Sequence, residues 1–329
     1  MRDKSIDVLR FIGLSCIILV HCNSPFLISQ LRCFDVPLML FVSGLACSGK
    51  VIPNYREYII KRAKRLLIPT WCFVSVFLIM ILAAQYALHK PLLSYSYIAE
   101  SFAMTGGIGY VWIVRVFLLV AIITPLIMWI EKRISNDKAL ISSVLIGGGI
   151  IEMIVLYTSS MAKDSFMQRI MNEWIITLFA YSLFFLMGLR MRRINAKRAW
   201  KIAGFFSLMM IVALAVYYFQ HGLPIRLSPN YKYPPHSYYI LYGFFACSLL
   251  WSAKNWFTPI LGNKLFLFIG QNTIWIYLYH ILFLYIPLPI NWVVKYFLVY
   301  GGALLMFSLQ YALYKGLKGR FSMAKYLIG

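Results

Sequence analysis

Apolar residues recur along this chain in ten long runs that short polar segments separate. Each run has about 17–23 residues, the length that an α-helix needs to cross the hydrocarbon core of a bilayer. The pattern predicts spans at 6–22, 32–49, 67–88, 110–130, 139–158, 173–190, 201–219, 237–253, 265–287 and 292–314. We therefore expect an all-α, polytopic membrane helical bundle that forms a single transmembrane domain over residues 1–329.

Composition supports the same class. Hydrophobic residues make up 61% of the chain and charged residues only 13%, whereas a typical soluble domain is about 25% charged. The six cysteines show neither a CxxC pair nor a Cys/His spacing suited to metal, so we expect no metal site.

The net charge of +22 is distributed unevenly between the loops. With the N-terminus in the cytoplasm, 24 of the 32 Lys and Arg residues fall in cytoplasmic segments. Seven fall on the opposite face: Arg32, Lys90, Lys163, Arg169, Arg226, Lys232 and Lys295. This bias follows the positive-inside rule and predicts an even number of spans with both termini cytoplasmic. The basic charge thus indicates topology and some attraction to the lipid bilayer, and it argues against a nucleic-acid partner.

Arg10 and His21 are ionisable residues in the first apolar run, where burying a polar side chain in a membrane costs free energy. Eleven helical steps separate them, which brings both side chains to one helix face about 16 Å apart along the axis. Ionisable residues within membrane segments are functional candidates by default. Burial favours the neutral imidazole, so His21 is suited to act as a general base or, in an acyl transfer, to carry the acyl group briefly.

Two further polar residues stand near or within the predicted spans. Asp35 lies near the outer start of the second span, where it is placed either to orient the His21 ring or to stabilise a helix N-terminus. Arg115 is the one basic residue within a span and must face a partner or a wet cavity. Together with Tyr110 and Trp112, it is a candidate for contact with a donor or an acceptor. Asp7, three residues before Arg10, is expected to pair with it.

Four motifs occur in order along the chain: IDVLR with His21, followed by VPLMLFVSG; YREYIIKRAKRLLIPTW; GGIGYVWIVRVFLL; and IGQNTIWIYLYHILF. Together they resemble the acyltransferase-3 family of membrane acyltransferases. The second motif is similar to the family's basic Arg-x-x-Arg segment, and the last is similar to its late Tyr-Leu-x-His motif. The chain departs from the family in VPLMLFVSG, where a second phenylalanine is usual, and in having no fused extracytoplasmic domain.

The resemblance implies a ten-span enzyme of the plasma (bacterial inner) membrane. It would take an acetyl group from acetyl-CoA, without a metal, and acylate a hydroxyl of a cell-surface polysaccharide or lipid-linked glycan. By position in the motifs, His21 would be the catalytic histidine, Arg10 its motif partner, and Arg62 and Arg65 the basic pair.

The donor side is expected at the cytoplasmic cations. Arg10, Arg62 and Arg65 are suited to hold the phosphates of the acyl-CoA by charge-assisted contacts, and Arg115 is a further candidate. A basic amphipathic segment on lipid headgroups is the other interpretation of residues 56–65.

Residues nearer the outer face are candidates for the acceptor side. His280 of the late motif serves either as a structural hydrogen-bonding group or as a substrate contact. Tyr110 and Trp112 are further candidates for substrate contact. The loop RLSPNYKYPPHSYY has aromatic residues suited either to stacking on sugar rings or to the membrane interface.

An alternative function belongs to another class. In a secondary transporter, Arg10, His21, Asp35 and Arg115 would form a substrate or proton path. The pairing of Arg10 with His21 and the cytoplasmic arginines favour the enzyme.

The charge bias yields a test of topology. A cysteine introduced near residue 195 should react with an impermeant thiol reagent only from the cytoplasmic side, and one near residue 230 only from the outside, because the span at 201–219 separates them. Labelling of intact cells and of inverted vesicles, with the parent chain as control, measures this. Reaction of both positions from one side would contradict the predicted orientation.

Overall fold

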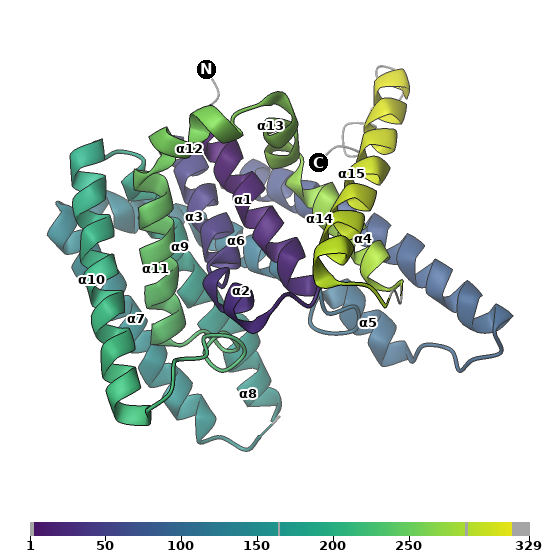
Figure 1. Cartoon of the computed structure of the whole chain (residues 1–329), viewed down its shortest axis with the longest axis horizontal. Helices are drawn as coiled ribbons and strands as arrows, with labels where there is room; N and C mark the ends of the chain where they lie inside the picture. Colours follow the sequence, from purple (N-terminus) through teal and green to yellow (C-terminus); the bar gives the residue numbers. More distant parts are fainter. Residues whose placement is uncertain (1–2, 164, 287–288, 318–329) are drawn as a thin grey trace. The chain divides into compact units, whose positions relative to one another are not determined.

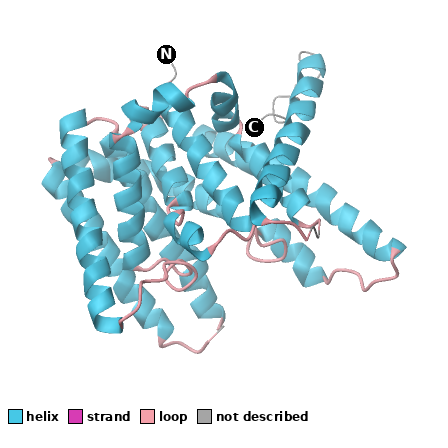
Figure 2. Cartoon of the chain, viewed as in Figure 1, coloured by secondary structure: helices cyan, strands magenta, loops and turns pink. Residues whose placement is uncertain are grey.

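The computed structural model describes residues 3–163, 165–286 and 289–317, and regular structure within these ranges is entirely helical (Figure 2). The all-α class predicted from the sequence is therefore confirmed. The helices, labelled in Figure 1, are α1 (Lys4–His21), α2 (Phe26–Leu31), α3 (Asp35–Cys47), α4 (Tyr55–Ala87), α5 (Tyr95–Ala103), α6 (Trp112–Arg133), α7 (Asp137–Ser159), α8 (Phe166–Ile170), the π-helical segment η1 (Met171–Ile176), α9 (Thr177–Met191), α10 (Ala196–His221), α11 (Ser237–Ser252), α12 (Lys254–Leu261), α13 (Lys264–Gln271), α14 (Thr273–Leu284) and α15 (Trp292–Leu317).

Seven helical segments of the described residues are long and apolar enough to cross a membrane. They are Phe26–Cys47, Tyr55–Ala87, Trp112–Arg133, Asp137–Ser159, Phe166–Met191, Ala196–His221 and Trp292–Gly316. The pair α13 and α14, interrupted at Asn272, makes an eighth if it counts as one span. The protein is thus a multi-pass membrane protein.

Two of the ten expected spans, at α1 and α11, are not both long and apolar enough to count as membrane spans, which leaves seven or eight. All ten predicted segments are helical, but α1 has 18 residues and carries Lys4, Asp7 and Arg10, and α11 has only 16 residues. A 16-residue helix is about 24 Å long, which is shorter than a bilayer core of about 30 Å. The cytoplasmic position of both termini stays a prediction.

The chain forms two compact units. The first contains the described residues within 1–20, 24–51 and 123–271, and the second contains those within 21–23, 52–122 and 272–329. Most of α1 belongs to the first unit, whereas its last residue, His21, belongs to the second.

Helix α9 is the core of the first unit and is buried along nearly its whole length. It packs closely on α3 because each helix has a glycine at the contact. A Cβ added to Gly44 would lie 2.1 Å from the carbonyl oxygen of Phe185, and one added to Gly188 would lie 2.0 Å from that of Phe41. Small residues let the backbones of membrane helices approach in this way.

Aromatic side chains fill the space between α9, α10 and α11. The ring centroid of Phe244 lies 4.8 Å from that of Phe184 and 5.3 Å from that of Phe206. All three side chains are fully buried or nearly so. Helices α10 and α11 lie side by side along this layer (Figure 1).

The second unit is built from α4, α5, the first part of α6, α14 and α15. Helix α15 approaches α14 at Gly302, where an added Cβ would lie 2.5 Å from the Phe283 ring. The indole of Trp71 on α4 donates a hydrogen bond to the carbonyl of Phe102 on α5, with an N–O distance of 3.1 Å.

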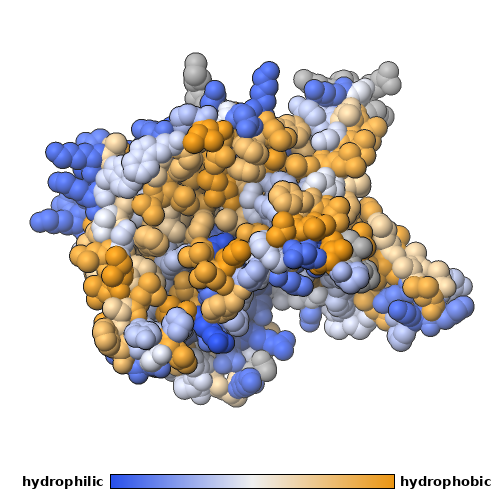
Figure 3. All heavy atoms as spheres, viewed as in Figure 1, coloured by the Kyte–Doolittle hydropathy of each residue, from blue (hydrophilic) through white to orange (hydrophobic). Residues whose placement is uncertain are grey.

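Large apolar side chains are also exposed at helical spacing. On α7 they include Ile146, Ile150 and Met153, and on α10 Leu208 and Ile211. Hydrophobic residues cover much of the face shown in Figure 3. Exposed apolar stripes of this kind are expected where helices face lipid rather than water.

The contact of α3 with α9 predicts the effect of a single methyl group. Gly44→Ala should lower the free energy of unfolding by about 1–3 kcal/mol, because the new Cβ forces the two helix backbones apart. The thermal unfolding midpoint of the detergent-solubilised protein measures the change.

Gly149→Ala on α7 is the matched control, because nothing lies within 4 Å of its added Cβ. Alanine is the better helix former, so this variant should be no less stable than the parent. Equal stability of the two variants would show that the α3–α9 contact tolerates a wider separation.

Candidate functional site

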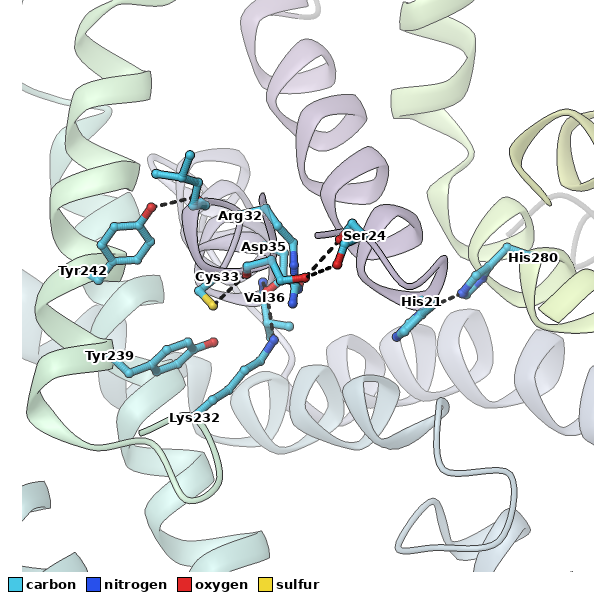
Figure 4. A network of polar contacts seen from close by, with 12 residues as sticks. His21, Ser24, Arg32, Cys33, Asp35, Val36, Lys232, Tyr239, Tyr242 and His280 are labelled. Carbon is cyan, nitrogen blue, oxygen red and sulfur yellow. Dashed lines mark hydrogen bonds and ion pairs between the residues drawn. The ribbon is translucent and has the colours of Figure 1, made fainter. Parts of the chain in front are cut away.

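The candidate base His21 is paired with a second histidine in the second unit. Its Nδ1 lies 2.9 Å from Nε2 of His280, a residue of α14 (Figure 4). The two rings are nearly parallel, with an interplanar angle of 13° and centroids 5.1 Å apart. The His280 side chain is fully buried, whereas that of His21 is partly exposed.

The surroundings of His280 determine which ring nitrogens carry protons. Nδ1 of His280 is within hydrogen-bond distance of the carbonyl oxygen of Tyr277, one turn earlier on α14. A carbonyl only accepts, so Nδ1 of His280 is the donor, and in the neutral ring its Nε2 is an acceptor. His21 must then donate from Nδ1, which leaves the lone pair on its Nε2. The pair therefore selects the tautomer that a general base requires.

Tyr110 packs against this histidine pair. Its ring meets the His21 ring edge to face, with centroids 4.7 Å apart. Its backbone carbonyl accepts a hydrogen bond from the hydroxyl of Tyr277. Because Tyr277 also supplies the carbonyl that orients His280, a single residue links both partners of His21.

The glycine-rich segment before α6 shapes the loop that presents Tyr110. Gly107 has φ +60°, and an added Cβ would lie 2.1 Å from Oγ of Ser101. That hydroxyl donates to the carbonyl of Tyr97 at 2.7 Å and accepts from the backbone N–H of Ile108 at 3.0 Å. The loop thus requires glycine both for its left-handed backbone and for its close approach to α5.

The remaining candidates of the third motif adjoin Tyr110. Burial raises the pKa of the Tyr110 hydroxyl above its ordinary value, so the group stays protonated and is a hydrogen-bond donor near neutral pH. Trp112 begins α6, and Arg115, three residues later, lies on the same side of the helix and is buried. Their predicted contacts with substrate stay predictions.

Arg10 lies in the first unit and pairs with Asp7, as the spacing predicts. Its NH1 is 3.0 Å from Oδ1 of Asp7, whose other oxygen accepts a hydrogen bond from Nε2 of Gln271 at 3.1 Å. Asp7 is buried, whereas the Arg10 side chain is 25% exposed. The late motif contributes directly here, because a Cβ on Gly270 would lie 1.9 Å from the carbonyl oxygen of Asp7.

The basic pair lies on the N-terminal part of α4, in the second unit. The Arg62 guanidinium is 5.6 Å from the ring centroid of Tyr58, and Arg65 is exposed. The segment begins at Asn54, whose side chain accepts a hydrogen bond from the backbone N–H of Glu57. These cations are accessible, but their binding of a donor stays a prediction.

Asp35 has two cationic partners within the first unit. Its carboxylate lies 2.5 Å from NH1 of Arg32 and 3.1 Å from Nζ of Lys232. Neither contact follows from the pattern of residues in the sequence. The predicted role of Asp35 in orienting His21 stays a prediction, while His280 supplies a tautomer-selecting contact.

From the sequence, no contact was predicted between His280, the histidine of the late motif, and His21. The signal that could have joined them is chemical: two histidines in apolar segments each need a hydrogen-bond partner, and each supplies one for the other. A second pair also escaped notice, in which Nδ1 of His236 lies 3.1 Å from the Glu152 carboxylate.

These features define a multi-pass helical membrane protein with a hydrogen-bonded histidine pair in its second unit. A family model described as an acyltransferase domain, Acyl_transf_3, matches residues 3–320. The chain therefore belongs to the acyltransferase 3 family, and membership suggests an enzyme that transfers acyl groups. Searches of curated proteins and of solved structures found no match.

Proposed function

We propose that this protein is a membrane O-acetyltransferase of the plasma (bacterial inner) membrane. It transfers the acetyl group of acetyl-CoA to a hydroxyl of a cell-surface polysaccharide or lipid-linked glycan. The observation that carries the proposal is the hydrogen-bonded series from His21 through His280 to the Tyr277 carbonyl, which leaves a lone pair on Nε2 of His21.

In the proposed reaction, Nε2 of His21 accepts the proton of the acceptor hydroxyl as the oxygen attacks the thioester carbonyl. The carbon–sulfur bond breaks, the thiolate leaves, and the proton passes from His21 to sulfur. During transfer His21 is an imidazolium whose Nδ1–H still donates to the neutral His280. That contact favours the charged form of His21 at the point where it develops.

The donor is proposed to bind through its phosphates at the accessible arginines. Arg62 and Arg65 lie on the N-terminal segment of α4. The acidic residue of that segment, Glu57, lies near Lys61, with an N–O distance of 3.7 Å. The Arg10 side chain, which contacts Asp7, is 25% exposed. Flexible cations of this kind suit a ligand with several phosphate charges.

Removal of the proposed base tests the function. His21→Ala should lower turnover by at least about 100-fold, since general-base catalysis contributes about 10²–10⁴-fold. Membranes incubated with labelled acetyl-CoA report transfer by the label found in glycan. His280→Ala should lower turnover less, because His21 keeps its basic nitrogen but loses the partner that selects its tautomer.

The double variant separates a coupled pair from two independent residues. His280→Ala added to His21→Ala should cost almost nothing more, because residues that act as a unit are non-additive. Tyr279→Phe, which removes only a hydrogen bond to Gln310, is the control and should leave turnover near that of the parent. High activity in a well-folded His21→Ala protein would overturn the assignment.

The donor site predicts a change in the Michaelis constant. Arg62→Ala or Arg65→Ala should raise the KM for acetyl-CoA about ten-fold or more, because each charge-assisted contact contributes about 1.5–3 kcal/mol. Lys61→Ala, on the same segment, is the control. An unaltered KM in both arginine variants would assign this segment to lipid headgroups instead.

A further inference from the structure

Three charged side chains form a buried cluster in the first unit. Arg32 follows α2, Asp35 begins α3, and Lys232 lies in the loop before α11. The two cations contact opposite oxygens of the Asp35 carboxylate, at 2.5 Å and 3.1 Å (Figure 4). None of the three side chains is more than 5% exposed.

The cluster carries a net charge of +1. Arg32 is always protonated at physiological pH. Burial disfavours the Lys232 ammonium, but the attraction of Asp35, together with Tyr233, raises the pKa of Lys232 above its ordinary value. One carboxylate therefore faces two permanent cations in a place that water barely reaches.

Hydrogen-bond donors also exceed acceptors within the cluster. Nε of Arg32 is buried and has no hydrogen-bond partner. Asp35 Oδ1 already accepts from Nζ of Lys232 and from the backbone N–H of Val36. A buried donor without an acceptor, beside an unbalanced charge, is a costly arrangement unless a further anionic group binds there.

The exposed ring of Tyr233 lies beside the buried ammonium of Lys232. Nζ of Lys232 is 5.5 Å from the ring centroid of Tyr233, a residue that is 55% exposed. On the inner side, the Tyr239 hydroxyl points toward the cluster (Figure 4) and lies 3.3 Å from that of Tyr181.

We propose that Arg32 and Lys232 bind one anionic group, a carboxylate or a phosphate, beside Tyr233. Such a group would neutralise the cluster and accept from the unpartnered Nε of Arg32. Arg32 and Lys232 belong to the cations that the charge pattern assigns to the outer face. The ligand is therefore an acidic sugar of the acceptor, which rests on the proposed function, or the phosphate of a lipid headgroup.

A series of variants that changes the cluster charge tests this site. Lys232→Met has a net charge of 0, the parent +1 and Asp35→Asn +2. The thermal unfolding midpoint of the purified protein in neutral detergent is measured against glucuronate, with glucose as the uncharged control. The parent midpoint should rise saturably with glucuronate and not with glucose. Arg226→Gln removes an exposed cation of the same loop and should behave as the parent.

The expected order of affinity follows the charge. Lys232→Met should lose the response, and Asp35→Asn should bind at least about ten-fold more tightly, because the competing carboxylate is gone. If the cluster has only a structural role, Asp35→Asn should gain no affinity for any anion. Lys232→Gln replaces Lys232→Met if the latter does not fold.

A second arm distinguishes the two sources of the anion. The same variants are placed in nanodiscs of dioleoylphosphatidylglycerol or dioleoylphosphatidylcholine. Stabilisation by phosphatidylglycerol alone, lost in Lys232→Met, would assign the site to lipid, whereas a response to glucuronate assigns it to an acidic sugar. The proposal fails if neither anion stabilises the parent, or if Lys232→Met responds as the parent does. Because no acyl donor is present, this result is independent of acyl transfer.

Discussion

Polar groups inside a helical membrane protein have little water to bind, so their partners must come from the chain itself. This constraint explains the arrangement of the main polar residues. Asp7 is bonded by Arg10 and Gln271, which join the first and last motifs of the sequence. His21 and His280 satisfy each other in the second unit. Each contact pairs residues distant in sequence or one helical turn apart, and each fixes a side-chain orientation.

In the proposed function, the two neutral rings of the histidine pair take the part that a carboxylate and a histidine take in a catalytic triad. A carboxylate would have to be buried with its charge, whereas His280 is buried as a neutral group held by a backbone carbonyl. His280 accepts from Nδ1 of His21 and so directs basicity to Nε2. Asp35 has a different environment, between two cations whose combined charge exceeds its own.

Glycines at helix contacts position these polar groups. Gly270 lets α13 approach the backbone of α1 at Asp7, and Gly107 lets the loop before α6 fold onto Ser101. In both places an added Cβ would overlap an oxygen atom. The glycines of the sequence motifs therefore allow close backbone contacts, and these contacts position the catalytic candidates beside them.

The sequence by itself determined the all-α class, the location of ten helical segments and the pair Asp7–Arg10, because hydrophobic runs and helical spacing are local properties. It also singled out His21 as the candidate base, which stays a prediction. Seven or eight of the ten segments in the described residues are long and apolar enough to cross a membrane, because α1 carries three charged residues and α11 has only 16 residues. The partnership of His21 with His280 and the cluster around Asp35 were decided only by the tertiary structure. These contacts join residues 259 and 197 positions apart, and no periodicity in a sequence specifies which distant helices meet.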